Sequence, residues 1–293
     1  MSAPLTLALA QYRVEPGRGV ARFAEKLGEL AGRARAGGAD LLVLPEYAAL
    51  EAAAGAEGPD VAAELRRALA LAPELLAVMR ETARREGIWI LGGSLPMAEA
   101  GEGRAVNRAP LIAADGRLAF QEKRVMTRFE REEWGITGGR GPAVFETPWG
   151  LLGIAICYDV EFPSLVRAQT VAGAWVILTP ACTDTLAGFN RVRLAARARA
   201  LENQCYVAVA PTVGAAPALA TLDVNRGYAA VFGPVDRGFP EDGVLARGPL
   251  DEAGLVFARL DPARLETVRR EGAVRNFADW PDSPPPAPRC VLA

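Results

Sequence analysis

The sequence contains no histidine. A serine–histidine–aspartate triad and a cysteine–histidine pair are therefore excluded, and so are zinc sites that depend on imidazole ligands. Any general base that works near neutral pH must be a carboxylate, a lysine, a tyrosine or a thiolate with a shifted pKa. This absence narrows the search for chemistry to a few residue types.

Cysteine is scarce, with four residues in a chain of 293. They lie at Cys157, Cys182, Cys205 and Cys290. Their spacing is not paired and includes no C-x-x-C, so neither a disulfide framework nor a cysteine zinc cluster is expected. Each cysteine is therefore considered singly, as a packing residue or as a nucleophile.

Long apolar runs and blocks of one charge are also missing. The formal net charge is -2, and no basic stripe predicts binding to nucleic acid or to a membrane surface. The apolar stretch from Leu5 to Ala10 is too short to span a bilayer and lacks a basic flank, so it is interpreted as a buried strand. No G-x-G-x-x-G follows a predicted strand. We expect a cytoplasmic protein that needs no metal and no organic cofactor.

The residues that are present suit a large core, because 51% are hydrophobic and 23% charged,. Short apolar runs predict strands at 5–11, 41–44, 88–91, 105–112, 118–123, 151–156, 175–178, 206–210, 227–232 and 255–260. Amphipathic stretches predict helices at 20–36, 64–86, 162–171 and 189–203, and 129–142 is expected to be a loop. Such alternation indicates an α/β fold, with a mixed sheet covered by helices. We expect one domain over residues 1–275 and a proline-rich tail over 276–293, extended from Asp279 on.

Three residues near strand ends have chemical potential. Cys157 ends the apolar run Gly153–Ile156 and precedes a predicted helix, which is where reactive groups collect in layered α/β folds; a buried structural cysteine is the alternative. Glu46 follows a buried strand, and Lys123 ends another. Each of these two is by itself as consistent with a solvated side chain.

Taken together, these residues resemble the Glu-Lys-Cys triad of the nitrilase superfamily of carbon–nitrogen hydrolases. The matching segments are L-P-E at Glu46, E-K-R at Lys123 and G-I-A-I-C-Y-D at Cys157. The stretch Glu130–Gly135 resembles the E-R-x-x-W-G segment that precedes the cysteine in many members. Residues Arg197–Asn203 resemble the family's helix after the active site.

The resemblance spans about residues 5 to 275. It implies a four-layer α-β-β-α sandwich that assembles into dimers or larger homo-oligomers through its outer helices. It also implies that Cys157 attacks the substrate, that Glu46 carries protons and that Lys123 holds the oxyanion with the backbone N–H of Tyr158. Glu46 would need a pKa raised by burial to serve as this base.

Glu130 is similar to the second glutamate of the family, which positions the lysine or the substrate. Glu132 and Glu133 are alternatives for that role. Asp159 is expected to hold the turn after the nucleophile. The side chains expected to line the substrate pocket are Tyr47, Phe129, Trp134, Cys182 and Thr183.

The predicted reaction is hydrolysis of a small amide through a thioester, releasing ammonia or amine. Tyr158-Asp159 follows the cysteine as in amidase-type branches, whereas nitrilases have Trp-Glu there. A nitrilase and an N-carbamoyl hydrolase remain alternatives, and an acyltransferase, a binding subunit and a thiol redox protein are rivals from other classes. Glu161 occupies a position where several ω-amidase-like members have arginine, which argues against an acidic substrate.

Overall fold

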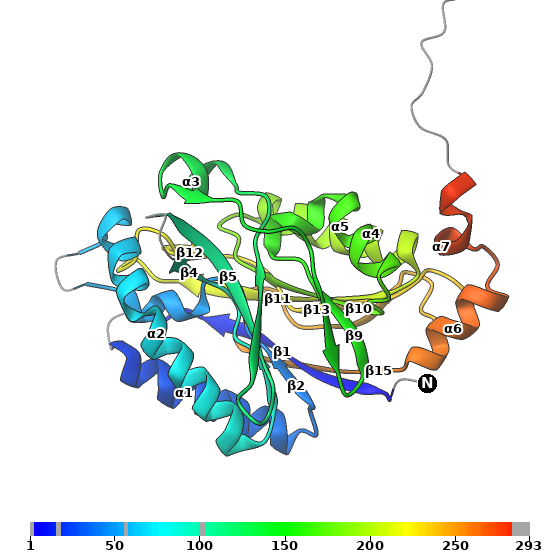
Figure 1. Ribbon diagram of the computed structural model, residues 1–293, viewed down its shortest axis with the longest axis horizontal. Coiled ribbons are helices and arrows are strands. Elements are labelled where there is room, and N and C mark those ends of the chain that lie inside the picture. Colours follow the sequence, from blue (N-terminus) through cyan, green and yellow to red (C-terminus); the bar gives the residue numbers. More distant parts are fainter. Residues whose placement is uncertain (1–2, 16–18, 56–57, 100–103, 283–293) are drawn as a thin grey trace, which may run out of the picture.

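The computed structural model describes residues 3–15, 19–55, 58–99 and 104–282 (Figure 1). The helices are α1 (Gly19–Ala36), η1 (Ala48–Ala53), α2 (Val61–Glu86), α3 (Arg128–Glu132), η2 (Cys157–Glu161), α4 (Pro163–Val171), α5 (Leu186–Asn203), α6 (Pro262–Glu271), α7 (Asn276–Asp279) and η3 (Trp280–Asp282), where η marks a 3₁₀ helix. The strands up to residue 137 are β1 (Leu5–Arg13), β2 (Leu41–Val43), β3 (Trp89–Leu91), β4 (Leu95–Ala98), β5 (Ala105–Ile112), β6 (Leu118–Glu122) and β7 (Ile136–Thr137). The later strands are β8 (Val144–Thr147), β9 (Gly150–Ile154), β10 (Val176–Ala181), β11 (Tyr206–Ala215), β12 (Val224–Asn225), β13 (Ala230–Phe232), β14 (Val244–Arg247) and β15 (Gly254–Leu260).

Within the described residues the strands join into one sheet, whose main order is β4-β5-β3-β2-β1-β11-β10-β9-β8. β1 pairs with β15 from Leu5 to Gln11 and with β2 from Leu7 to Leu9, but it meets β11 only at Tyr12 and Arg13. The sheet therefore divides at β1 into two halves. Helices α1 and α2 cover one half and α4 and α5 cover the other (Figure 1). The predicted four-layer α-β-β-α sandwich is confirmed.

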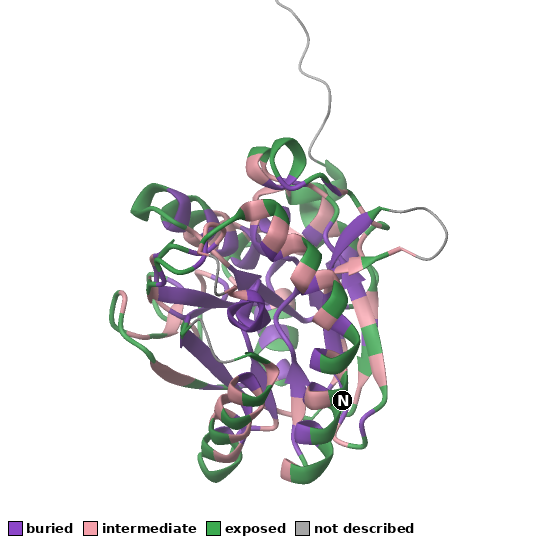
Figure 2. Cartoon of the chain, turned by 90° about the vertical axis from the view of Figure 1, so that its left-hand side faces the viewer, coloured by how far each residue is buried: buried purple, intermediate pink, exposed green. Residues whose placement is uncertain are grey.

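Strand β1 shows why the halves stack. Its alternate residues on one face enter the core that includes β9 and β10: Leu5, Leu7 and Leu9. Those on the other face enter the core beneath α1 and α2: Ala8, Ala10 and Tyr12. A strand has a side-chain period of two, so two buried faces require covering layers on both sides. Figure 2 shows the central strands largely buried, with exposed residues along the outer helices.

Most predicted strands and helices are present, and one expected loop is wrong. Residues 129–142 contain the helical turn α3 and the short strand β7. Helix α3 begins with a capping box, in which Thr127 and Glu130 bond each other's backbone,. Strand β4 and helix α6 were not predicted. The expected extended tail begins with the turns α7 and η3 instead, and residues 283–293, including Cys290, lie outside the described residues.

The arrangement of strands brings three strand ends together. β2 leads into Glu46, β6 leads into Lys123, and β9 leads through two residues into Cys157. β1 and β2 are parallel, and β9 and β10 are parallel within the other half. Glu46 and Cys157 therefore reach the site from different halves of the sheet.

Candidate active site

A close backbone approach fixes the loop that carries Glu46. Gly93 has φ +71°, and a Cβ added there would lie 2.0 Å from the carbonyl oxygen of Pro45. Only glycine fits this approach without strain. The N–H of Tyr47 donates to the carbonyl of Ser94 at 2.9 Å, and Glu46 is 1% exposed. The carboxylate is thus buried on a rigid turn.

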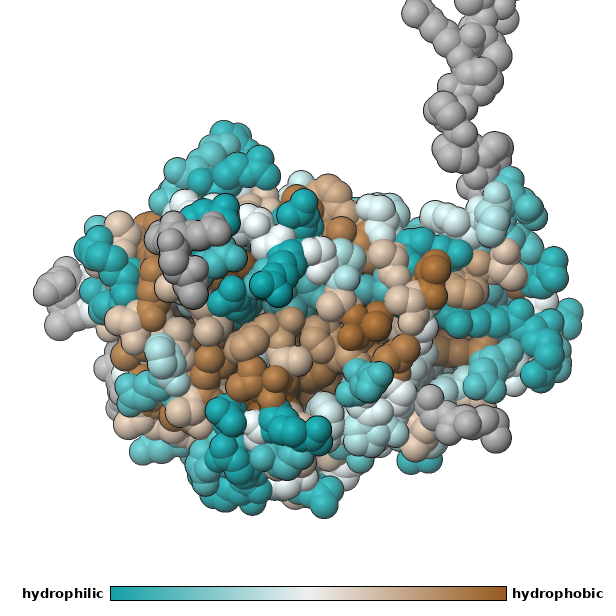
Figure 3. Space-filling view, viewed as in Figure 1, coloured by the Kyte–Doolittle hydropathy of each residue, from teal (hydrophilic) through white to brown (hydrophobic). Residues whose placement is uncertain are grey.

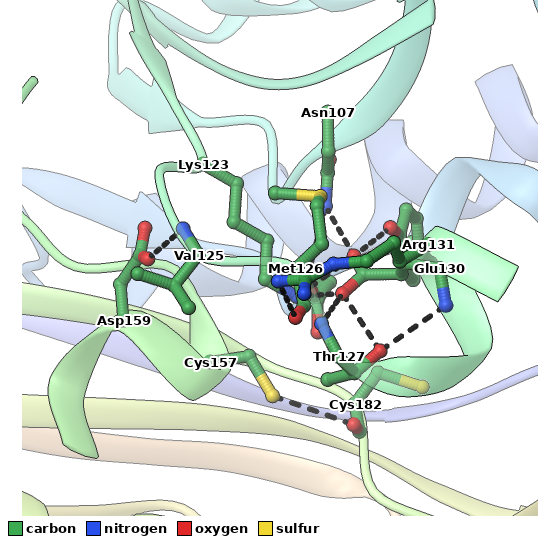
Figure 4. Close-up of polar contacts among 12 residues, drawn as sticks. Asn107, Lys123, Val125, Met126, Thr127, Glu130, Arg131, Cys157, Asp159 and Cys182 are labelled. Atoms are coloured by element: carbon green, nitrogen blue, oxygen red, sulfur yellow. Dashed lines mark hydrogen bonds and ion pairs between the residues drawn. The ribbon is translucent and has the colours of Figure 1, made fainter. Parts of the chain in front are cut away.

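Lys123 lies between two carboxylates. Its Nζ is 2.8 Å from Glu46 Oε1 and 2.7 Å from Glu130 Oε2. All three side chains are buried. Figure 4 shows Lys123 and Glu130 converging, with Asn107 on one side of them and Cys157 on the other. A buried cation with two buried anions leaves one net negative charge in the cluster, which is sustained by the hydrogen bonds around it.

Glu130 is held by its own helix. Its Oε2 accepts hydrogen bonds from the N–H and the hydroxyl of Thr127, both at 2.9 Å. Of the three acids that were alternatives, it is the one that reaches Lys123. Glu132 is exposed and pairs with Arg128, and Glu133 is exposed. The capping box therefore aims Glu130 inward.

Two further side chains complete the cluster. Tyr47 has a left-handed backbone, with φ 62°, and its hydroxyl donates to Glu130 Oε1. Asn107 Nδ2 donates to Glu46 Oε1 at 3.0 Å. Asn107 was not predicted as a site residue. The feature that could have identified it is the antiparallel β5–β6 hairpin, which places Asn107 across from Lys123.

Cys157 begins the 3₁₀ helix η2 with φ 47°. This left-handed conformation is strained for a residue with a Cβ and is typical of functional turns. Its Sγ lies 3.5 Å from the carbonyl oxygen of Cys182. The N–H of the next residue, Tyr158, donates to no acceptor among the described residues. A free N–H beside the sulfur is suited to receive an oxyanion.

Asp159 holds the nucleophile's turn, as the sequence predicted, and it does so across elements. Its carboxylate accepts from the backbone N–H groups of Arg124 at 3.0 Å and Val125 at 2.8 Å. These two residues directly follow Lys123. One carboxylate therefore ties the Cys157 turn to the Lys123 segment.

The electrostatics of the cluster separate its two glutamates. Burial raises the pKa of Glu46 to about 7, although Lys123 opposes the rise. Burial also acts against the charge of Glu130, but Lys123 and its hydrogen bonds prevail and lower its pKa. The two carboxylates overcome burial and keep the pKa of Lys123 well above its usual value. Burial, then Glu46, raises the pKa of the Cys157 thiol, so the thiol needs a base to ionise.

The predicted pocket residues have different positions. Phe129 lines a hollow of about 720 Å³ whose walls also include Val125 and Tyr158. Trp134 is buried, with its ring 5.1 Å from that of Tyr47, and supports the cluster from behind. Cys182 presents its carbonyl to Cys157.

Thr183 turns its hydroxyl to the carbonyl of Arg226. It is not among the residues that line the hollow. Of the five predicted pocket residues, Phe129 is the one that lines this hollow.

A second hollow, of about 640 Å³, lies between the β5–β6 and β8–β9 hairpins. Trp89, Leu118 and Val144 line it, and Leu118 begins β6, at the opposite end of that strand from Lys123. In the space-filling view, apolar side chains gather across the middle of this face of the molecule (Figure 3). None of the residues that line this second hollow is a candidate nucleophile. The hollow that Tyr158 lines, next in sequence to Cys157, is therefore the candidate substrate site.

Two other properties concern the described part of the chain. No set of three or more cysteine, aspartate or glutamate side chains in it is arranged to hold a metal ion. None of its helices combines the length and the apolar run that a bilayer crossing requires.

Comparison with known sequences adds a family. The protein-family model described as carbon-nitrogen hydrolase matches residues 6–270 of this chain. A deaminated glutathione amidase of Synechocystis sp. is 32% identical over 263 residues, covering 85% of this chain and 88% of that protein. The probable hydrolase YhcX of Bacillus subtilis is 31% identical over 276 residues, which are 94% of this chain. The chain spans about half of that relative, 53% of its length.

Comparison with solved structures points the same way. The amidase from Nesterenkonia sp. AN1 superposes with a TM-score of 0.72 at 26% identity, over 91% of this chain and 96% of that one. One structure of that amidase, a mutant, shows covalent addition of the acetamide moiety of fluoroacetamide at its active site cysteine.

Proposed function

The chain belongs to the carbon–nitrogen hydrolase family of the nitrilase superfamily, and from that premise we propose that it hydrolyses a small amide through a thioester on Cys157. The observation that carries this proposal is the buried cluster of Glu46, Lys123 and Glu130 beside a strained cysteine with a free neighbouring N–H. It supplies a nucleophile, a base and a positive charge in one place.

The first half of the reaction forms the thioester. Glu46 takes the thiol proton of Cys157, and the sulfur attacks the amide carbon. The negative charge that develops on the carbonyl oxygen is held by the ammonium of Lys123 and the N–H of Tyr158. Glu46 then gives its proton to the nitrogen as the carbon–nitrogen bond breaks, so ammonia or amine leaves neutral.

The second half releases the acid. Glu46, again a carboxylate, removes a proton from water, and the resulting hydroxide attacks the thioester. The carbon–sulfur bond breaks, the acid departs and Cys157 recovers its proton. A glutamate with a pKa of about 7 is suited to both proton transfers because it is close to ambient pH,. The side chains of Cys157, Glu46 and Lys123 and the backbone N–H of Tyr158 supply every step, so the proposal requires no metal or organic cofactor.

Glu130 and Tyr47 have a supporting part in this proposal. Glu130 keeps Lys123 protonated and aimed, and the Tyr47 hydroxyl occupies one oxygen of Glu130. Neither needs to touch the substrate. The roles of Phe129 and the other walls of the hollow are to exclude water and select the acyl group.

An amide is preferred over a nitrile for two reasons. Attack on an amide yields a tetrahedral oxyanion that fits Lys123 and the Tyr158 N–H, whereas a nitrile yields a planar thioimidate with charge on nitrogen. The Synechocystis and Nesterenkonia relatives named above are amidases. The acyl group that the hollow selects is left to experiment.

The test is an ammonia-release assay on matched amide and nitrile pairs that share the same acyl group. We expect kcat/KM to be higher for the amide in each pair. Nitrile turnover equal to or faster than amide turnover across the panel would overturn the assignment. Urea-type carbamoyl compounds belong in the same panel, because an N-carbamoyl hydrolase would prefer them.

A further inference from the structure

Asn107 is a buried polar residue to which the mechanism above gives no part. It lies on β5 with none of its surface exposed. The backbone carbonyl oxygen of Asn107 accepts a hydrogen bond from the backbone N–H of Lys123 at 2.9 Å. The hairpin register therefore fixes the Asn107 side chain relative to Lys123, and both point into the same cluster (Figure 4).

Two donors converge on one oxygen of Glu46. Asn107 Nδ2 is 3.0 Å from Oε1, and Lys123 Nζ is 2.8 Å from the same atom. A proton on Oε1 would face both N–H groups and would remove the acceptor that they share. The other oxygen, Oε2, accepts no hydrogen bond from Lys123 or Asn107.

The orientation of the Asn107 amide is set by charge. Its Nδ2 also lies 3.4 Å from Glu130 Oε1, so the NH₂ group stands between two carboxylates. A flipped amide would turn its oxygen toward both of them. The Oδ1 atom is buried and has no partner among the described residues. The site thus leaves an acceptor unsatisfied in order to keep this donor in place.

We propose that Asn107 is a positioning residue that confines the proton carried by Glu46 to Oε2. The inference rests on the proposed role of Glu46 as the proton carrier. In the first step the S–H bond of Cys157 breaks and an Oε2–H bond forms. In the next, that bond breaks as the leaving nitrogen gains the proton, while Oε1 keeps its bonds to Lys123 and Asn107. The Asn107 amide is a neutral hydrogen-bond donor. It therefore favours the carboxylate form of Glu46 without changing the single net negative charge of the cluster.

The experiment follows alkylation of Cys157 by iodoacetamide across pH, with the modified peptide identified by mass. This readout needs no knowledge of the substrate. In the unsubstituted protein the rate should rise with pH through the pKa of Glu46, about 7. Asn107→Leu removes the donor at similar volume, and the rise should move upward by about one pH unit because the carboxylate loses a hydrogen bond.

Two further variants sharpen the test. Asn107→Asp keeps the shape but adds a third carboxyl group, so the pH at which the alkylation rate rises should also move upward. This variant decides the question if circular dichroism shows that Asn107→Leu does not fold. Asn203→Leu is the matched control: Asn203 is equally buried and its amide donates to the carbonyl of Arg199, away from the cluster. Its rise should stay where the unsubstituted protein has it.

The failures are distinguishable. If a folded Asn107 variant is alkylated at Cys157 and its rate rises at the same pH as in the unsubstituted protein, this inference is overturned but the proposed function is not. If iodoacetamide leaves Cys157 unmodified at every pH, the nucleophile itself is wrong and the proposed function falls with it.

Discussion

At the scale of single residues, the site contains two buried glutamates whose pKa values move in opposite directions. Glu130 shares both of its oxygens with Lys123 and is further satisfied by Thr127 and Tyr47. Glu46 engages Lys123 through one oxygen. The better-satisfied carboxylate stays charged, and the other becomes the one that can exchange a proton near neutral pH.

This difference predicts the pH dependence of activity. Burial raises the pKa of Glu46 to about 7, and the reaction needs its carboxylate form in the free enzyme. We expect kcat/KM to rise as pH increases through about 7. The pKa of Lys123 is raised well above its usual range, so its charge should persist on the alkaline side. A rise centred near 4.5, the ordinary value for glutamate, would contradict this assignment.

The strained backbone of Cys157 makes a second prediction. Cys157→Ala and Cys157→Gly should each reduce kcat by at least about 10³-fold, because both lack the nucleophile. The glycine variant should nevertheless be the more stable by about 1 kcal/mol, since φ 47° is unstrained only for glycine,. Denaturant unfolding measures the difference.

Cys205 is the control for that comparison. It is buried too but has an ordinary φ, so its alanine variant should be more stable than its glycine variant. Turnover by Cys157→Ala, or the ordinary order of stability at position 157, would refute the prediction.

At the scale of elements, the positions of the strands could be predicted from the sequence better than the way in which the strands pair. Strands such as β1 and β10 are apolar runs bounded by turn residues, and such runs are visible in one dimension. α3 was missed because its charged residues look like a loop, although Thr127 and Glu130 form a recognisable capping box. Asn107 was missed although both strands of its hairpin were predicted, because only the register of β5 against β6 places its side chain beside Lys123.

The first turn of α2 holds one wall of the hollow. Glu64 is 1% exposed. Its carboxylate accepts from the N–H of Ala220 at 2.7 Å and from the N–H and hydroxyl of Thr221 at 3.1 and 2.6 Å. Both partners line the hollow beside Tyr158. Glu64 thus anchors this wall from a distant part of the chain.

We therefore expect Glu64→Ala to affect binding more than chemistry. Leaving these donors unpaired should lower the free energy of unfolding by about 1–3 kcal/mol. KM for the preferred amide should rise several-fold while kcat changes little. Glu74→Ala, an exposed position on the same helix, is the matched control and should match the unsubstituted protein. A Glu64→Ala variant with unchanged stability and KM would contradict this role.

At the scale of the whole molecule, the site exists only because the two halves of the sheet stack. Glu46 and Lys123 come from one half and Cys157 from the other. β1 and β11 join the halves through a short parallel contact, and no local pattern in the sequence predicts that junction. The four-layer architecture was predicted from the resemblance to a family, whereas the alternation of strands and helices predicted only the α/β fold class.

The outer helices predict assembly into a homodimer or a larger homo-oligomer. Leu194 and Leu201 lie seven residues apart on α5 and so share a face, and they are 53% and 40% exposed,. Burying such a face against a second copy is the commonest closed solution. Sedimentation at micromolar concentration should give at least twice the 31.0 kDa chain mass.

Charge placed on that face should disrupt the assembly. Leu194→Glu with Leu201→Glu should yield monomers. Leu250→Glu, at an exposed apolar position outside α5, should leave the assembly intact. A monomer of the unsubstituted protein would contradict the prediction.

The central claim is the thioester on Cys157, and its most direct test is the mass of enzyme quenched in acid during the first turnover. The amide with the highest kcat/KM should be mixed with excess enzyme, quenched on the millisecond scale and mapped by peptide mass. We predict that the Cys157 peptide transiently gains the mass of one acyl group as ammonia is released, and that Cys157→Ala shows neither event. Ammonia release while the Cys157 peptide stays unmodified at every quench time would contradict the account.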